Sequence, residues 1–123
     1  MERKQAVDLI NTHAKKSNYF EFVVYSFSEQ NLVIAGSDNL IYYHTLEVHL
    51  KNPFHISSKM TWKVDVDRVV AEDPAWEEWV AYNRTYKIEE GNFTIKFIDE
   101  DGLVFYFSFT EIDVFEKTVK YFK

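Results

Sequence analysis

The spacing of apolar positions predicts a helix at the start of the chain, followed by strands. Between Glu2 and Lys16, apolar side chains recur every three or four residues, at Val7, Ile10 and Ala14. The next run, Tyr19–Ser28, is rich in aromatic and β-branched residues, which is typical of a strand. Both of its faces are largely apolar, so we predict a central strand that is covered on each side. Turn-forming residues at 28–31 and 36–39 enclose a short partner strand, Leu32–Ala35.

Two runs in the middle of the chain alternate between apolar and polar positions, as a strand with one buried face does. They are Leu40–Leu50 and Phe54–Asp65, and the turn residues 51–53 separate them. We predict that the two runs pair as a hairpin, in a register that places His49 opposite His55. The positions predicted to face the core are Leu40, Tyr42, His44, Leu46, Val48, Leu50, Phe54, Ile56, Met60, Trp62 and Val64.

The remainder of the chain predicts a short helix, a meander of strands and a final helix. Asp73-Pro74 is typical of a helix start, and apolar residues follow it at helical spacing, which predicts a helix over about 74–82. Three β-like runs at 84–89, 93–98 and 103–109 are separated by turns and predict adjacent antiparallel strands. Thr110–Asp113 then fits a capping box and predicts a C-terminal helix, whose apolar stripe is Ile112, Phe115, Val119 and Phe122.

This order of elements indicates the α+β class. Strands and helices are segregated along the chain, and residues 1–123 contain no linker, repeat or low-complexity tract. We therefore expect a single α+β domain. Its antiparallel sheet should have about six or seven strands, with N-terminal, short middle and C-terminal helices packed on it.

Composition excludes several classes of function and localisation. The chain has no cysteine, so disulfides, thiolate catalysis and cysteine-based metal sites are excluded. Apolar residues make up 46% of the chain, which is too apolar for a disordered protein. The first residues do not resemble a secretory signal, and no apolar run approaches the ~20 residues of a membrane-spanning helix. We expect a cytoplasmic protein that does not enter a membrane.

Charge is distributed unevenly along the chain. The net charge is −6, which argues against a nucleic-acid partner because phosphate contacts require clustered basic residues. Residues 64–113 carry 4 basic and 13 acidic side chains, a net charge of −9, whereas residues 1–63 carry +1 and residues 114–123 carry +2. An acidic segment of this kind would attract a basic protein partner.

The histidines suggest a weak candidate for a metal site. On a strand, Glu47 and His49 share one face, and the predicted hairpin adds His55 from the neighbouring strand, so these three residues could converge on one ion. The alternative is an exposed polar face on which Glu47 pairs with Lys59. We favour that alternative and expect no cofactor. His44 lies on the apolar face, where we expect a buried, hydrogen-bonded histidine.

No other motif indicates catalysis. Paired carboxylates are frequent, but most lie at predicted turns, where solvent would leave their pKa values unshifted. The three glycines stand alone, so no phosphate-binding loop is present. A spatial triad that uses a histidine stays open.

The segment around residue 76 is the strongest candidate for a binding surface. Tryptophan is enriched at binding hot spots, and acidic neighbours would steer a basic partner. The predicted surface consists of Trp76, Trp79, Glu77, Glu78, Asp99 and Glu100. Alternatively, both tryptophans pack the short helix onto the sheet.

Two classes of function remain. We favour a non-catalytic protein-binding module, such as an inhibitor or immunity-type protein, that covers a basic partner with its acidic half. The alternative is a small enzyme or ligand-binding domain with an aromatic pocket in the curved sheet.

Overall fold

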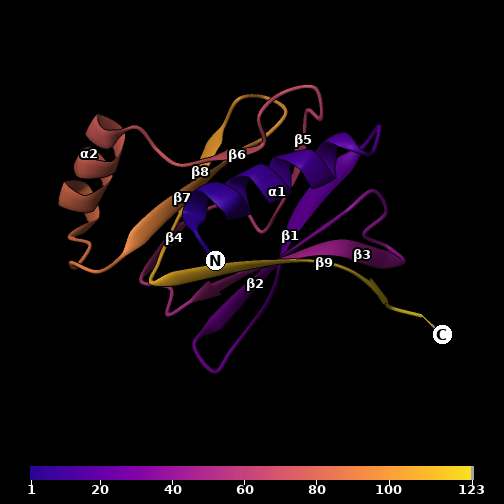
Figure 1. Cartoon of the computed structure of the whole chain (residues 1–123), viewed down its shortest axis with the longest axis horizontal. Coiled ribbons are helices and arrows are strands. Elements are labelled where there is room, and N and C mark those ends of the chain that lie inside the picture. The colour runs from indigo at the N-terminus through magenta and orange to yellow at the C-terminus, as the bar shows by residue number, and fades with distance from the viewer. Residues whose placement is uncertain (123) are drawn as a thin grey trace.

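The computed structural model describes residues 1–122, and over that range the chain forms two helices and nine strands in antiparallel sheets (Figure 1). The α+β class is therefore as predicted. The elements are α1 (Arg3–Lys15), β1 (Phe20–Ser28), β2 (Asn31–Ser37), β3 (Tyr43–Lys51), β4 (His55–Ser57), β5 (Thr61–Val64), β6 (Ala71–Glu72), α2 (Trp76–Tyr86), β7 (Phe93–Ile98), β8 (Val104–Phe109) and β9 (Glu111–Lys120).

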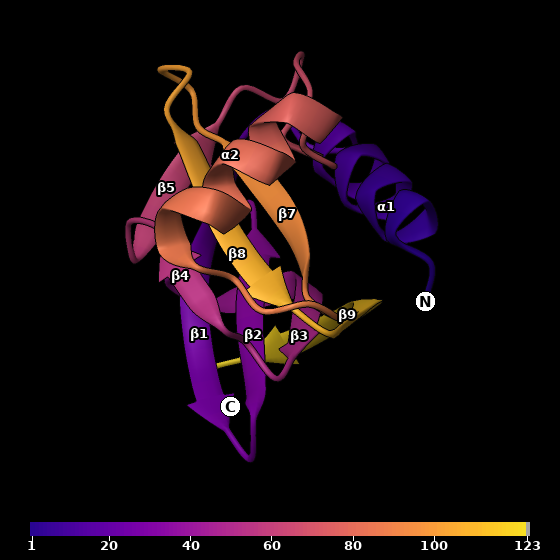
Figure 2. The ribbon, with the colours of Figure 1, turned by 90° about the vertical axis from the view of Figure 1, so that its left-hand side faces the viewer.

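The strands form two sheets, not the one sheet predicted. A five-stranded sheet has the order β5-β1-β2-β3-β9, and a four-stranded sheet has the order β4-β8-β7-β6. α2 lies across the outer face of β7 and β8, while α1 lies beside β9 and β6 (Figures 1 and 2). The apolar core includes Ala6, Ile10, Phe20, Phe22, Leu32, Ile34, Leu46, Val48, Leu50, Trp62, Ile95, Phe97, Phe105, Phe107, Phe109 and Ile112.

The predicted hairpin between residues 40–50 and 54–65 is wrong. The second run splits into β4, which pairs with β8, and β5, which pairs with β1. His49 lies opposite Val33 and Asp113, and His55 lies opposite Ser108. Alternation indicates which side chains share a face, but it does not select the neighbouring strand.

This rearrangement changes which of the predicted core positions are buried. Trp62 and Val64 of β5 are buried as predicted, together with His44, Leu46, Val48 and Leu50 of β3. Four predicted core residues are instead exposed: Tyr42, which precedes β3, Phe54 and Ile56, which lie beside and in the short β4, and Met60, which precedes β5.

The predicted C-terminal helix is also wrong, because this segment forms β9. Ile112 and Val114 are buried opposite Leu50 and Val48 of β3. The segment is rich in β-branched and aromatic residues, which fit a pleated, half-buried surface. Pairing with β9 also removes an exposed edge from β3, a tertiary benefit that local helical spacing does not reveal.

The other differences concern element boundaries. α2 ends at Tyr86, and Lys87 in the left-handed conformation (φ 53°) caps it, so the predicted strand 84–89 is wrong. Gly36, predicted in a turn, lies in β2. β1 is central in its sheet as predicted, but residues 25–28 are exposed, so the strand is not covered on each side.

Candidate functional site

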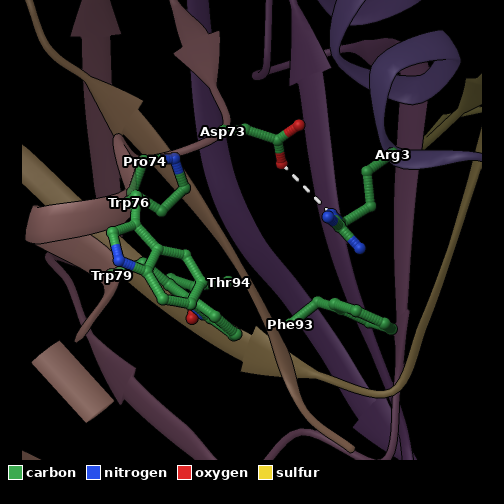
Figure 3. Close-up of a pocket in the computed structure, with 7 residues that line it drawn as sticks. All are labelled: Arg3, Asp73, Pro74, Trp76, Trp79, Phe93 and Thr94. Carbon is green, nitrogen blue, oxygen red and sulfur yellow. Dashed lines mark hydrogen bonds and ion pairs between the residues drawn. The ribbon is translucent and has the colours of Figure 1, made fainter. Parts of the chain in front are cut away.

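A hollow of about 260 Å³ lies beside the first turn of α2. The start of α1, the loop before α2 and the beginning of β7 form its walls (Figure 3). The lining residues are Arg3, Asp73, Pro74, Trp76, Trp79, Phe93 and Thr94. Three of the seven are aromatic, and two carry opposite charges, so the hollow can stack on a flat group and also contact a charged one.

α2 places both tryptophans on the same wall. Trp76 and Trp79 are three residues apart and therefore share a helix face. Their ring centroids are 5.4 Å apart at an angle of 51°. Trp79 is half-buried, but Trp76 is 72% exposed, so packing onto the sheet does not account for Trp76.

On the opposite wall, the guanidinium of Arg3 lies between the ring of Phe93 and the carboxylate of Asp73. The guanidinium carbon Cζ of Arg3 lies 4.1 Å from the centroid of the Phe93 ring. Arg3 Nε lies 3.4 Å from Asp73 Oδ1, and both side chains are about two-fifths exposed, at 42% and 43%. A guanidinium over an aromatic face is a cation–π contact, which links the first turn of α1 to β7.

Thr94 is the buried residue among those that line the hollow. The residue is only 2% exposed, and its Oγ1 has no hydrogen-bond partner among residues 1–122. An unsatisfied buried polar group costs about 1–3 kcal/mol. This oxygen is also closed to solvent, so a ligand in the hollow would not reach it without a rearrangement of the wall.

The predicted acidic residue Glu78 holds α2 to the sheet. Its carboxylate accepts hydrogen bonds from Lys96 Nζ at 2.9 and 3.2 Å and from the Tyr106 hydroxyl at 2.5 Å. Burial by itself would raise the pKa of Glu78, but these hydrogen bonds outweigh it and lower the pKa. Glu77, on the same turn, is exposed.

Asp99 and Glu100 lie away from the tryptophans. Asp99 is 7% exposed, and its Oδ1 accepts hydrogen bonds from the backbone N–H groups of Asp101 and Leu103, both at 2.9 Å. Asp99 therefore shapes the turn between β7 and β8. Both predicted residues line a second hollow, together with Lys59, and this hollow shares no residue with the first.

The predicted metal trio does not come together. Glu47 and His49 are in contact, with Oε1 and Nε2 2.8 Å apart, but His55 hydrogen-bonds the Tyr82 hydroxyl of α2 at 2.5 Å. Lys59, the predicted alternative partner of Glu47, lies 3.9 Å from Asp99 instead. Across residues 1–122, no group of three His, Asp or Glu side chains could hold a metal ion.

His44, and not the predicted His55, is the second histidine that contacts Glu47. The register of β3 against β9 shifts between His44 and Leu46, so His44 lies on the same face as Glu47. His44 Nε2 lies 2.7 Å from Glu47 Oε2, and the Tyr121 hydroxyl lies 2.7 Å from His44 Nδ1. His44 is buried and hydrogen-bonded as predicted, although its partner Glu47 was predicted on the other face.

Glu47 is an ionised carboxylate with several internal partners. Burial would raise its pKa, but hydrogen bonds from His49, His44 and Lys117 lower it. His49 Nδ1 in turn contacts Asn31 Nδ2 at 2.9 Å. This cluster links β2, β3 and β9 on the outer face of the five-stranded sheet. The hydrogen-bonding groups of Glu47 and His49 therefore have partners within the protein.

Sequence reasoning identified the two tryptophans but missed the wall that faces them. Arg3 and Phe93 are 90 residues apart, and neither lies in a motif. Only the packing of α1 against β6 and β9 brings Arg3 to the hollow. No local signal could have indicated this pair.

Comparison with family models, curated proteins and solved structures finds no match to this chain. Neither of the helices within residues 1–122 is long and apolar enough to cross a membrane.

Proposed function

We propose that the protein is a non-catalytic protein-binding module that docks a basic partner on the hollow and on the exposed first turn of α2. The observation that carries this proposal is the exposure of Trp76 on the wall of the hollow, beside the exposed carboxylate of Glu77.

The energetics of Trp76 support a binding role. Burying a large aromatic side chain contributes about 1.5–3 kcal/mol, and Trp76 leaves most of that contribution unused in the free protein. Tryptophan is also enriched among the few residues that dominate binding free energy at interfaces. A partner that covers Trp76 would obtain this contribution with a side chain that the helix already orients.

The exposed carboxylates support a basic partner. Fewer acidic residues are available to that partner than the sequence suggested. Glu78 and Asp99 have internal partners: Glu78 holds α2 to its sheet, and Asp99 shapes the turn between β7 and β8. Glu77 and Glu100 are exposed and can steer a partner through the solvent. The contact surface that we propose therefore consists of Trp76, Trp79 and Glu77, with Glu100 contributing to long-range attraction.

Internal pairing also favours binding over catalysis. The two clusters richest in titratable groups, around Glu47 and around Glu78, use their hydrogen bonds within the protein. A general acid or base needs a proton-accepting or proton-donating atom within reach of a substrate. Neither carboxylate lines the hollow.

Measured association rates test the proposal. A basic partner captured from cell lysate at low salt is immobilised, and the association of Glu77→Gln/Glu100→Gln is compared with wild type. We expect the double variant to associate more slowly at low salt, with little change in dissociation. The matched control is Asp8→Asn/Glu29→Gln, which removes the same charge from exposed sites elsewhere.

Trp76→Ala tests the contact itself. We expect faster dissociation and a loss of affinity of tenfold or more, since hot-spot truncations cost about 2 kcal/mol or more. Met60→Ala, at an exposed apolar residue between β4 and β5, is the control and should bind as wild type does. Equal binding by the Trp76 variant would refute the proposal.

A small-molecule site is the second candidate, and the three aromatic side chains that line the hollow favour it. The aromatic pocket would then lie beside α2, because aromatic rings such as Phe22, Trp62 and Phe97 pack the interior between the sheets. The volume weighs against this candidate, since about 260 Å³ is below the roughly 300–1,000 Å³ typical of drug-sized ligands.

A further inference from the structure

We propose that the hollow beside α2 binds an arginine side chain of the partner, and that Arg3 competes for this site in the free protein. The proposal rests on the proposed function, because it names the group by which the basic partner is recognised.

Arg3 indicates which chemistry the hollow accepts. Its guanidinium lies over the Phe93 ring, 4.1 Å from the centroid, and Nε faces Asp73 Oδ1. A flat, delocalised cation can stack on an aromatic face and donate in its own plane to a carboxylate at the same time. The protein therefore holds a guanidinium in the hollow by the same two contacts that a partner's arginine would make.

Arg3 is held weakly enough to be displaced. The separation of 3.4 Å between Nε and Asp73 Oδ1 is longer than the roughly 2.7–2.9 Å of a strong charge-assisted hydrogen bond. Both side chains are about two-fifths exposed, at 42% and 43%, and exposed ion pairs contribute little to stability. An incoming guanidinium can take the carboxylate while Arg3 turns to solvent.

The rest of the lining suits one extended arginine. Trp76 and Trp79 face Arg3 and Phe93 across the hollow and offer further aromatic faces (Figure 3). The volume of about 260 Å³ fits a side chain better than a whole cofactor.

Lysine and anionic groups fit less well. The ammonium of lysine is a strongly hydrated point charge that does not stack on a ring as a guanidinium does. An anion would approach the carboxylate of Asp73, and Arg3, the cation that could attract it, already faces that carboxylate. The occupant is therefore an arginine of a basic segment.

The experiment uses three short peptides that are identical except for one central residue, which is arginine, lysine or neutral citrulline. The probes are titrated into the full chain while tryptophan fluorescence and the indole N–H signals in NMR spectra are recorded. We expect the arginine peptide to bind several-fold more tightly than either of the others, since lysine cannot stack on the rings and citrulline carries no charge for Asp73. The indole signals of Trp76 and Trp79 should shift, whereas that of buried Trp62 should not.

The Arg3→Ala variant gives the decisive result. Removal of an internal competitor raises the fraction of open sites, so the arginine peptide should bind several-fold more tightly to this variant. Arg84→Ala, at an exposed arginine on α2 that does not line the hollow, is the matched control and should bind as wild type does. Asp73→Asn should abolish the preference for arginine over citrulline.

Three results would overturn the inference: weaker binding to Arg3→Ala, equal binding of the arginine and citrulline peptides, or no binding of the arginine peptide to either protein. A failure of the proposed function would be distinguishable. In that case the captured partner itself would be insensitive to Trp76→Ala. If the partner depends on Trp76 but the peptides do not bind, only the arginine assignment falls.

Discussion

Gly36 is the residue on which the close packing of the five-stranded sheet depends most directly. A Cβ atom added there would lie 2.6 Å from Cε2 and 2.9 Å from Cζ of Phe20, whose ring is fully buried. The ring cannot move without displacing Phe22, which it contacts edge-on with centroids 5.3 Å apart. The absence of a side chain therefore has a packing role here.

Gly36→Ala should lower the free energy of unfolding by about 1–3 kcal/mol, because overpacking forces buried rings out of their preferred positions. Denaturant unfolding followed by circular dichroism measures the change. Gly91→Ala is the control for steric crowding, since a Cβ at Gly91 would meet no atom within 4 Å and only its positive φ of 92° opposes the substitution. A Gly36→Ala variant as stable as wild type would contradict this close packing of Phe20 against Gly36.

Trp62 is the other residue whose packing is decisive. Its ring stacks on Phe22 and contacts Phe97 and Phe105 edge-on, with centroids 5.1–5.6 Å apart. Trp62→Ala should cost ~3–5 kcal/mol. Trp62→Phe should cost less, because it keeps a ring and removes an indole N–H that has no partner among the described residues. Equal losses in the two variants, measured by chemical unfolding, would contradict this packing.

At the scale of single elements, the hairpin between β1 and β2 contains local strain. Glu29 and Gln30, which connect the strands, both have positive φ values, 51° and 61°. Such a turn matches the twist of the strands, but the left-handed conformation costs non-glycine residues free energy. Asn-Gly is the sequence best suited to it.

Glu29→Asn/Gln30→Gly should therefore raise the free energy of unfolding by about 1 kcal/mol, because asparagine and glycine adopt positive φ at lower cost. Thermal melting measures the gain. Glu29→Gln is the control for charge, since it removes the carboxylate and leaves the turn strained. An unchanged melting temperature in the double variant would indicate that the turn is relaxed as it stands.

The attachment of α2 to its sheet makes a prediction for alkaline pH. The rings of Tyr82 and Tyr106 stack with centroids 5.0 Å apart, and burial raises the pKa of both phenols to about 12. A hydrogen bond to Glu78 adds to the shift at Tyr106. Because the folded-state pKa exceeds the unfolded value of about 10, this stabilisation is complete below pH 10 and is lost as the pH rises through 12.

Absorbance titration of tyrosinate should therefore show Tyr82 and Tyr106 as the last of the eight tyrosines to ionise, and unfolding should set in between about pH 10 and 12. Tyr106→Phe should remove one of the late ionisations. Tyr19→Phe, at an exposed ring, is the matched control and should leave both late ionisations in place. Titration of all eight tyrosines near pH 10 would contradict the burial of this contact.

At the scale of the whole molecule, the charges of the acidic half have two different uses. Lys96 binds Glu72 at 2.8 Å and Glu78 at 2.9 Å, so part of the negative charge of residues 64–113 is neutralised within the fold. Exposed carboxylates such as Glu77 and Glu100 are left to act on the surroundings. The net charge of the segment therefore overstates the charge available to a partner.

Elements with a local and unambiguous pattern could be predicted from the residues alone. The apolar stripe of Val7, Ile10 and Ala14 specifies α1, and β1, β7 and β8 follow from aromatic, β-branched runs between turns. Local spacing is sufficient here because the apolar residues of each run fit either the helical or the strand periodicity, but not both. The tryptophans of α2 were identified for the same reason.

Long-range packing determines how the strands are divided between two sheets, which secondary structure residues 111–120 adopt and where the hollow forms. Residues 111–120 fit both a helical stripe and a strand, and the unpaired edge of β3 selects the strand. Residues 54–65 alternate continuously, yet β8 and β1 each pair with one half. Arg3 and Phe93 meet only after both sheets and α1 have packed. These outcomes depend on contacts between distant residues, whose free energies no local pattern records.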